Sequence, residues 1–474
     1  MIFNSLQFLV FFPIVTVLFF VLPHRFRSLL LLAASCYFYM AFRPAYILIL
    51  LFTITVDYFS GRILSITQGR ARKLCLAGSL CANVGVLVFF KYFNFFNDSL
   101  RSVGGIFHWA DPIPGLNIVL PIGLSFHTFQ SMSYTIEVYR GRYEAERNFF
   151  RLALYVLFYP QLVAGPIERP QHLLPQFRKY LDFDYERVRS GLQLMAWGFF
   201  KKLAIADQFA PIVTTVYGNP HSYSGPAILQ ATYCFAIQIY ADFSGYSDMA
   251  IGAAQVLGIQ LVKNFDRPYF SQSIGEFWRR WHISLSTWFR DYVYIPLGGS
   301  RSGMDRQCVN LLITFAISGL WHGANWTFVA WGVLNGLYLA ASVLTAGLRE
   351  KIRTVYPAAG PFGRMFRTAI TFHLIVLSWI FFRAPSIAEA FGMLRAVATW
   401  RHGSPIVFPE AKSMVLFTVA ILFGVEAVQS RMPLRRFVSA QRPMIRWAVY
   451  VTGLMLVALL SDFTTSYPFV YFQF

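Results

Sequence analysis

One of the nine histidines in the sequence stands where an ionisable side chain is unexpected. His322 lies in the motif SGLWHGANW (residues 318–326), directly after the apolar run 309–320, and Gly319 and Gly323 bracket it. An ionisable residue at membrane depth is costly and marks a candidate functional site. Imidazole exchanges a proton near neutral pH, so the chemistry to expect is general acid–base catalysis. A core histidine with satisfied hydrogen bonds is the structural alternative.

His282 and Ser286 form a second candidate pair, four residues apart. A serine hydroxyl beside a histidine can act as a nucleophile activated by a base. The same spacing brings any two side chains together on a helix. No third residue that would orient His282 is evident in the sequence, so a structural role for the pair remains open.

The segment that surrounds this pair, residues 264–306, is rich in arginine and tryptophan. Between residues 275 and 294, large apolar side chains recur at the spacings of one helical face: Trp278, Trp281, Leu285 and Trp288. Tryptophan and arginine favour membrane interfaces, so the pattern predicts an amphipathic helix in the interface plane. A compatible functional hypothesis is that Arg279, Arg280 and Arg290 receive an anionic group, such as the phosphates of a nucleotide-linked donor.

Acidic residues also occur among apolar neighbours: Asp57, Glu137, Asp207, Asp242 and Asp248. Transporters use such groups as proton relays, and pairing with the many arginines is the structural alternative. In the stretch YADFSGYSDMAIG (residues 240–252), Gly, Ser and Asp follow one another closely. We expect this stretch to pack closely or to cap a broken helix at the wall of a chamber.

The composition indicates which kind of element must position these residues. Of 474 residues, 56% are hydrophobic and only 13% are charged, with a net charge of +19, whereas soluble domains carry about 25% charged residues. A disordered chain, a fibrous repeat and a nucleic-acid binder all fit poorly, because charges occur in short clusters between long apolar runs. The five cysteines include no CxxC pattern, so we expect neither a disulfide framework nor a metal site.

The apolar runs predict a multi-pass membrane protein. The first run lacks a basic start and a small-residue cleavage site, so we expect a retained helix. Candidate spans cover residues 2–22, 29–42, 46–59, 74–90, 118–138, 192–217, 226–257, 309–320, 326–343, 369–382, 414–428 and 447–460.

The distribution of basic residues predicts the orientation. Clusters at 62–73, 140–151, 349–367 and 431–446 are expected in the cytoplasm, and the loop 91–117 outside it, which places both termini outside. Residues 152–164 break the alternation, because basic clusters flank this short apolar run on both sides. With Pro160, Gly165 and Pro166, residues 152–166 predict a re-entrant element that lines a polar chamber.

Several stretches, taken in order, closely resemble the membrane-bound O-acyltransferase (MBOAT) family. They are VAGPI (163–167), YADFSGYSDMAIG, SIGEFWRRWHISLSTWFRDYVYIPLGG (273–299), GLWHGANW (319–326) and PFVYFQF (468–474). The nearest branch is that of bacterial polysaccharide O-acetyltransferases, such as the alginate and cellulose-acetylation membrane proteins. The resemblance implies an all-α fold in one membrane domain over residues 1–474. In this fold, about 11–12 tilted transmembrane helices, with re-entrant and interfacial helices, form a ring around a central funnel or tunnel.

The resemblance also implies a function and its residues. His322 matches the invariant histidine of the family, expected to be the general base, and His282 matches a second family histidine. The expected reaction moves an acetyl group from cytoplasmic acetyl-CoA across the bacterial inner membrane to an exported polysaccharide, with a separate extracytoplasmic partner protein and without a cofactor or metal. Candidate donor- or acceptor-binding residues are Trp278, Arg279, Arg280, Trp281, Ser286, Arg290, Asn325, Asp242 and Ser244.

Three alternatives remain open at this stage. A transporter or flippase would use the same architecture without acyl chemistry. An O-acyltransferase could act on another acceptor, such as peptidoglycan, a lipid or teichoic acid. Acetyl transfer could also pass through a covalent acetyl-enzyme on Ser286 or on a histidine.

Overall fold

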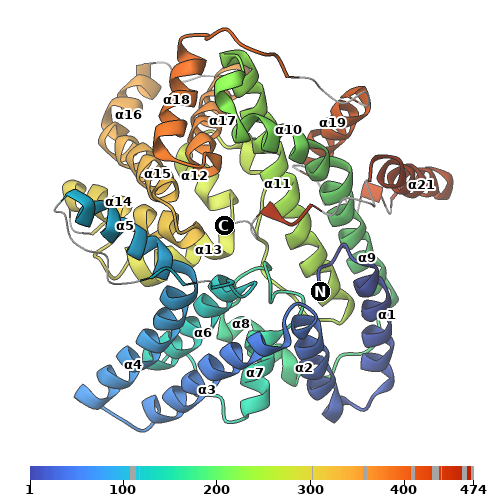
Figure 1. The fold of residues 1–474 in the computed structure, drawn as a ribbon. Coiled ribbons are helices and arrows are strands. Elements are labelled where there is room, and N and C mark those ends of the chain that lie inside the picture. Colours follow the sequence, from blue (N-terminus) through green and yellow to red (C-terminus); the bar gives the residue numbers. More distant parts are fainter. Residues whose placement is uncertain are drawn as a thin grey trace. The chain divides into compact units, whose positions relative to one another are not determined.

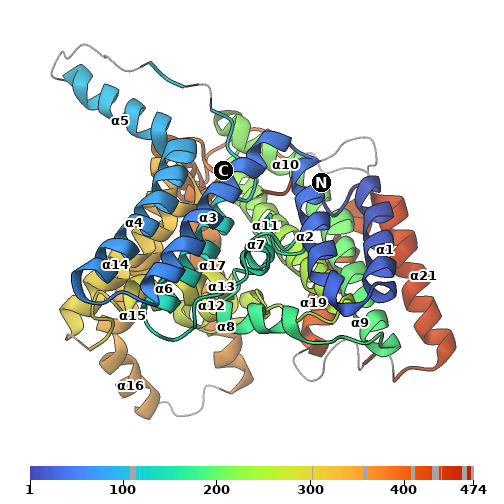
Figure 2. The ribbon, with the colours of Figure 1, turned by 90° about the horizontal axis from the view of Figure 1, so that it is seen from below.

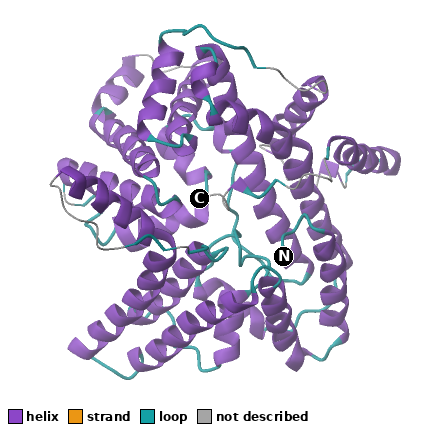
Figure 3. Cartoon of the chain, in the orientation of Figure 1, coloured by secondary structure: helices purple, strands orange, loops and turns teal. Residues whose placement is uncertain are grey.

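The computed structural model describes residues 1–106, 114–116, 118–301, 303–355, 360–406, 412–429, 437–438, 440–461 and 467–470. Over these residues the chain is helical, without a strand, and the single backbone bridge joins Tyr223 to Ser404 (Figure 3). The predicted all-α class is confirmed. The chain forms two compact units, Met1–Ala196 with Tyr246–Val262, and Trp197–Gly245 with Lys263–Phe474.

The first unit contains the blue and cyan helices of Figure 1, and α9 and α11 contribute to both units. Its helices are α1 (Leu6–Val21), α2 (His24–Met40), α3 (Ile47–Leu64), α4 (Gly69–Leu87), α5 (Phe93–Ile106), α6 (Leu124–Tyr139), α7 (Phe149–Leu157) and α8 (Pro170–Leu173), with α9 (Tyr185–Phe199) and α11 (Gly225–Val256) shared.

The second unit contains the remaining helices. They are α10 (Asp207–Gly218), α12 (Ile274–Arg280), α13 (Ile283–Phe289), α14 (Met304–His322), α15 (Trp326–Leu344), α16 (Ala346–Val355), α17 (Pro361–Arg383), α18 (Ile387–Ala398), α19 (Lys412–Gln429) and α21 (Pro443–Leu460). π-helical turns precede α10 at Phe200–Ala206 and follow α13 at Arg290–Tyr294.

Five of the described helices are long and apolar enough to cross a membrane. They cover Pro44–Leu64, Gly69–Gly104, Trp326–Leu344, Pro361–Arg383 and Pro443–Leu460. A span of this kind needs about 20 residues at 1.5 Å each to cover the hydrocarbon layer. Two shorter apolar helices, Leu6–Val21 and Val415–Gln429, accompany them. The second span is longer than the predicted 74–90, because a π-helical turn at Val88–Tyr92 joins α4 to α5 without a break.

A buried carboxylate joins three helices of the first unit, α3, α4 and α6, which lie side by side in Figures 1 and 2. Asp57 of α3 accepts hydrogen bonds from Ser79 and Asn83 of α4 at 2.6 and 3.0 Å, and from Thr135 of α6 at 3.0 Å. Neutral donors thus satisfy this carboxylate. The proposed pairing of buried acids with arginines does not apply here.

The predicted re-entrant segment, residues 152–166, begins as the nine-residue helix α7 and continues as non-helical backbone. Every residue from 152 to 168 is buried. Gly123, with a φ of 77°, approaches this backbone so closely that a Cβ atom would lie 2.7 Å from the Leu162 carbonyl oxygen. Its depth in a membrane stays a prediction, and its irregular backbone is enclosed by protein as such a segment requires.

The hairpin of α14 and α15 is the most extensive helix pair of the second unit. A Cβ atom at Gly319 would lie 2.2 Å from the Phe328 carbonyl oxygen, and one at Gly332 would lie 2.2 Å from that of Phe315. Small residues let helix backbones approach in this way in membrane proteins. The close pairing fixes the end of α14, where His322 lies.

The predicted amphipathic helix over residues 275–294 is wrong as a single element. The structure divides it into α12 and α13, because His282 between them adopts a left-handed conformation with a φ of 42°. Trp281, Leu285 and Trp288 are buried in the protein rather than spread along an exposed face. The apolar periodicity therefore records protein packing on both sides of a break.

Candidate active site around His322 and His282

His322 is the last residue of α14, and its side chain is 5% exposed. Its Nδ1 lies 2.6 Å from the carbonyl oxygen of Ser318, one turn earlier in the helix. A carbonyl oxygen can only accept, so Nδ1 carries the proton and Nε2 carries the lone pair. The helix end thereby fixes the tautomer in which Nε2 can accept a proton from a substrate.

Aromatic rings surround the His322 imidazole. The ring centroids of Trp321, Trp331 and Phe382 lie 5.0, 4.9 and 5.6 Å from it, each at a steep angle. Trp331 in turn stacks on Trp379 at 5.7 Å. These rings come from α14, α15 and α17, so three helices hold the imidazole in place and keep water from it.

His282 is 1% exposed and is held by a residue that the sequence analysis did not identify. Its Nδ1 lies 3.1 Å from the side-chain oxygen of Asn264. The same oxygen accepts hydrogen bonds from the backbone nitrogen and hydroxyl of Ser284, at 3.2 and 2.9 Å. Since the amide oxygen only accepts, His282 also carries its proton on Nδ1. Asn264 lies 18 residues earlier, so no local spacing indicated it.

The two histidines belong to one site although 40 residues separate them in the sequence. The Trp321 ring lies 5.0 Å from His322 and 6.2 Å from His282. Burial, and after it the electrostatic influence of His322, lowers the pKa of His282 well below its usual value. His282 is therefore neutral at physiological pH, because its charged form would be desolvated beside a second titratable ring.

The three arginines predicted to receive an anion have different partners. Arg280 pairs with Glu276 at 2.6 Å, and Arg290 pairs with Asp291 at 2.8 Å. Arg279 is exposed, and no carboxylate of the described residues lies within ion-pair distance of it. Of the three, Arg279 is thus the one without a carboxylate partner among the described residues, and its binding to a donor phosphate stays a prediction.

The predicted aromatic and polar residues near the histidines mostly support the packing. Trp281 stacks on Phe277 at 5.5 Å and Trp278 meets Trp331 at 5.6 Å. The Ser286 hydroxyl donates to the Trp281 carbonyl oxygen at 3.2 Å, so the described contacts do not join it to the His282 ring. The proposed Ser–His pair is not assembled in this structure.

Asn325, the remaining polar candidate near His322, caps α15. Its side-chain oxygen accepts from the backbone nitrogen of Thr327 at 3.0 Å, and its amide donates to the Pro385 carbonyl at 3.1 Å. These bonds tie the turn after His322 to the loop after α17. A contact of Asn325 with substrate stays a prediction.

Asp242 and Ser244 lie on α11 and contact two buried lysines. Lys202 lies 2.8 Å from Asp207 and 2.8 Å from Asp242, and Lys201 donates to Ser244 at 2.9 Å. Asp242 also accepts from the backbone nitrogen of Val470 at 2.6 Å. These contacts hold residues near the end of the chain, and direct binding of donor or acceptor by Asp242 or Ser244 stays a prediction.

Within the described ranges, no three His, Cys, Asp or Glu side chains are grouped so that they could hold a metal ion. The five cysteines are free thiols there. The site therefore offers two buried imidazoles, each with its Nδ1 beside an acceptor oxygen, in an aromatic enclosure with one exposed arginine on α12. This arrangement can remove a proton from a hydroxyl group.

Known protein families and curated proteins share sequence with this chain. The model of the membrane-bound O-acyltransferase family matches residues 121–382, which include both histidines. A probable alginate O-acetylase of Azotobacter vinelandii is 40% identical over 90% of this chain and 84% of its own length. One of Pseudomonas aeruginosa is 39% identical over 85% and 76%. A peptidoglycan O-acetyltransferase of Helicobacter pylori is 35% identical over 78% and 74%.

Proposed function

The chain belongs to the membrane-bound O-acyltransferase family, and we propose that it transfers acetyl groups from cytoplasmic acetyl-CoA to an exported polysaccharide of the alginate type. Family membership and the five apolar helices make it a multi-pass membrane enzyme that catalyses O-acyl transfer. The donor, the direction and the acceptor are the proposed part. The observation that carries the proposal is the fixed Nδ1–H tautomer of His322 inside an aromatic enclosure.

In the proposed reaction, Nε2 of His322 takes the proton of an acceptor hydroxyl as the oxygen attacks the thioester carbonyl carbon. The tetrahedral intermediate then collapses, so that a C–O bond has formed and the C–S bond breaks. The proton on His322 passes to the leaving thiolate, which yields free CoA. General base catalysis of this kind contributes about 10²–10⁴-fold to the rate.

The other residues have supporting roles in this proposal. His282 stays neutral and positions the donor or acceptor beside His322, or assists the proton transfer. Asn264 orients His282 without contacting substrate. Arg279 binds donor phosphates, because its guanidinium has no carboxylate partner among the described residues. An extracytoplasmic partner protein at the bacterial inner membrane places the acetyl group on the polymer.

The test is transfer of radiolabelled acetyl from acetyl-CoA by inner-membrane vesicles that contain the chain and the partner protein, with the exported polymer as the final acceptor. We expect label in the polymer and an equal amount of free CoA. Uptake of label into vesicles without thioester cleavage would instead identify a transporter. Label bound to the protein after incubation with donor alone would identify an acetyl-enzyme.

Peptidoglycan is a second candidate acceptor, because a relative named as a peptidoglycan O-acetyltransferase is 35% identical over most of this chain. The acetyl content of both polymers in a strain that lacks the chain separates the two. Loss from the exported polysaccharide alone supports the proposal. Loss from peptidoglycan alone reassigns the acceptor.

A further inference from the structure

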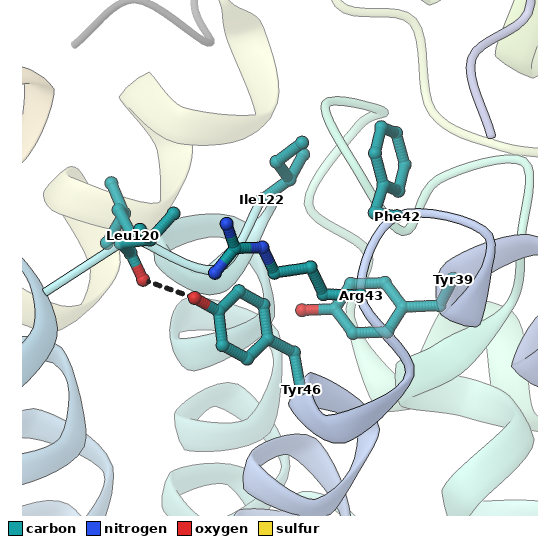
Figure 4. Close-up of a pocket in the computed structure, with 7 residues that line it drawn as sticks. Tyr39, Phe42, Arg43, Tyr46, Leu120 and Ile122 are labelled. Atoms are coloured by element: carbon teal, nitrogen blue, oxygen red, sulfur yellow. Dashed lines mark hydrogen bonds between the residues drawn. The ribbon is translucent and has the colours of Figure 1, made fainter.

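A cavity of about 160 Å³ opens in the first unit, where α2 ends and α3 begins (Figure 4). Residues 119–122, which precede α6, form its other wall. Tyr46 joins the two walls, because its hydroxyl donates to the carbonyl oxygen of Val119 at 2.9 Å. Two further lining residues, Tyr39 and Arg43, carry polar groups that no other described residue hydrogen-bonds. The cavity therefore offers two sets of donors to a ligand.

Tyr39 supplies the cavity with a buried hydroxyl. Its side chain is 2% exposed, and its hydroxyl has no hydrogen-bond partner among the described residues. In Figure 4 this hydroxyl points toward Tyr46 and the Arg43 side chain. Burying a hydroxyl without a partner costs free energy. A ligand that places an oxygen atom here would recover that cost, because the hydroxyl can donate to it.

Arg43 supplies an exposed positive charge without a counter-ion. No carboxylate of the described residues lies within ion-pair distance of it, and its guanidinium carbon lies 5.9 Å from the centroid of the Tyr46 ring. Guanidinium groups bind phosphates and carboxylates through charge-assisted hydrogen bonds. The lining of the cavity contains no acidic residue, so no group of the lining competes with an anion for this charge.

The cavity lies at the end of a helix that is long and apolar enough to cross a membrane. This span starts at Pro44, next to Arg43, and it exposes Leu48 and Phe52, at 65% and 53%, on the first two turns of α3. Tyrosine is enriched at the level of lipid headgroups, and arginine side chains near the ends of spans extend to that interface. The cavity therefore opens at headgroup depth, beside a helix that contacts acyl chains.

The positive-inside rule does not account for the arginine at this position. Residues 62–73 form a basic cluster expected in the cytoplasm. Arg43 precedes the opposite end of α3, so it is expected to face outward, where basic residues are less frequent. An arginine that stands there without a protein partner indicates a local anion, and lipid phosphates are the anions found at that depth.

The volume and the lining fit part of a phospholipid headgroup. A cavity of about 150 Å³ holds a benzene ring, so this one accepts a phosphate with its nearest glycerol carbons, while the acyl chains stay in the bilayer. A choline or ethanolamine group would bring a second positive charge beside Arg43, so an anionic headgroup fits better. An inorganic phosphate would leave the aliphatic part of the lining, Val119, Leu120 and Ile122, without a contact.

We propose that this cavity binds the headgroup of an anionic phospholipid, such as phosphatidylglycerol. Arg43 pairs with the phosphate, and the Tyr39 hydroxyl donates to a glycerol or ester oxygen. A lipid held there contacts the turn between α2 and α3 together with residues 119–122, so it stabilises the first unit. The site is separate from the proposed reaction, because it gives the chain a lipid partner whether or not an acetyl group is transferred.

The test is native mass spectrometry of the purified full chain in uncharged detergent, titrated with phosphatidylglycerol or with phosphatidylcholine of the same acyl chains. We expect phosphatidylglycerol to stay bound at concentrations where phosphatidylcholine does not. Arg43→Gln removes the charge and should weaken phosphatidylglycerol binding by about tenfold, and Tyr39→Phe removes the hydroxyl alone and should weaken it by a smaller factor. Arg25→Gln is the matched control, because Arg25 is also exposed and lies over an aromatic ring, that of Phe26 at 4.8 Å, outside the cavity.

The thermal unfolding midpoint is a second readout, and its value in phosphatidylcholine shows whether each variant has kept its fold. We expect phosphatidylglycerol to raise the midpoint of the unaltered chain and of Arg25→Gln, but not that of Arg43→Gln, because a ligand stabilises only the state that binds it. Equal binding of the two lipids, unchanged binding in Arg43→Gln, or an equal loss in Arg25→Gln would overturn the site. Glycerol phosphate without acyl chains separates the two sources of phosphate: if it binds as tightly as phosphatidylglycerol, the cavity takes a soluble anion and the lipid assignment is wrong.

Discussion

The second unit buries ionisable side chains in two regions. One region surrounds them with neutral groups, and the other pairs them with opposite charges. In the histidine site, the Nδ1 atoms of His322 and His282 contact the neutral oxygens of Ser318 and Asn264, and aromatic rings fill the remaining space. In the lysine cluster, defined as Lys202, Asp207 and Asp242, opposite charges compensate one another at 2.8 Å.

The difference separates a reactive arrangement from a structural one. Lys202 also donates to the Tyr467 carbonyl, and Asp242 accepts from the Val470 nitrogen, so the lysine cluster uses its groups to hold backbone. In the histidine site, the Ser318 carbonyl oxygen and the Asn264 side-chain oxygen each accept the Nδ1 proton of one ring. Nε2 of each ring is therefore the basic nitrogen. A buried catalytic group needs one atom free to exchange a proton, whereas a buried structural ion needs its charge fully compensated by partners.

The largest expected effect is on acetyl transfer, and it compares His322 with a histidine that has the same local geometry. His373 of α17 also contacts the carbonyl four residues earlier, Ala369, at 2.7 Å, but its side chain is exposed. We expect His322→Ala to lower acetyl transfer by about 10²–10⁴-fold, because the general base is lost. The measurement is CoA release from acetyl-CoA by the purified protein with the acceptor and the partner protein present.

His373→Ala is the control, since it loses an equivalent local bond. We expect it to retain activity close to that of the unaltered chain. Equal losses in the two variants would mean that the helix contact matters and the buried site does not. Full activity in His322→Ala would remove His322 from the mechanism.

The next effect concerns the lysine cluster and falls on stability. Lys202→Met leaves the buried Asp242 and the partly buried Asp207 without their cation, so we expect a loss of about 3–5 kcal/mol in the free energy of unfolding. The thermal unfolding midpoint of the purified protein measures it. The triple variant Lys202→Met, Asp207→Asn, Asp242→Asn removes all three charges and should recover most of the loss. A triple variant as unstable as the single one would show that packing, rather than charge, holds this cluster.

A smaller effect tests whether Asn264 orients His282. Asn264→Ala removes the acceptor of the Nδ1 proton, and we expect kcat to fall by about tenfold, which corresponds to about 1.4 kcal/mol. Asn264→Asp keeps an acceptor but adds a negative charge, which raises the pKa of His282. Because the neutral ring is needed, the acid limb of the pH–rate profile should then move to higher pH.

The control for this prediction is Asn310→Ala. Asn310 lies on α14, and its buried side-chain amide donates to the Gly299 carbonyl oxygen at 3.0 Å. It should lower stability without moving the pH profile. A profile that does not move in Asn264→Asp would show that Asn264 has only a packing role.

Local periodicity and the order of the motifs were enough to predict where helices lie and where His322 stands. The run 226–257 became α11, Gly225–Val256, and the motif around residue 322 placed the histidine at a helix end. The break at His282 was missed, because the apolar spacings around it continue as in one helix. A positive φ at a non-glycine residue depends on tertiary contacts, here with Asn264, and leaves no local pattern.

Partners distant in sequence were missed for the same reason. Asp57 is satisfied by neutral groups on two other helices, and Asp242 holds backbone near residue 470. Apolar sequence around an acid shows that it is buried. It does not show whether an arginine, a lysine or a hydroxyl compensates it, since that depends on which helices pack together.

The smallest expected effect is on stability and concerns a histidine of the first unit. Like the lysine cluster it pairs with a carboxylate, and like the catalytic candidates it is an imidazole. His172 lies 2.6 Å from the buried Glu168, and its own side chain is 41% exposed. The hydrogen bond to Glu168 raises the pKa of His172 above its usual value. Its stabilising contribution is therefore fully present below about pH 6.5, the unfolded value, and is lost as the pH rises through the higher folded value.

The difference in unfolding midpoint between the unaltered chain and His172→Gln should thus be present at acid pH and vanish at alkaline pH. We expect it to be small and to shrink with added salt, because solvent screens an exposed partner. A difference that grows with pH would show that neutral His172 is the stabilising form. His172 would then stabilise the fold in its neutral form, as the buried histidines are expected to. Partial exposure of a histidine beside a carboxylate would not be enough to indicate a charged pair.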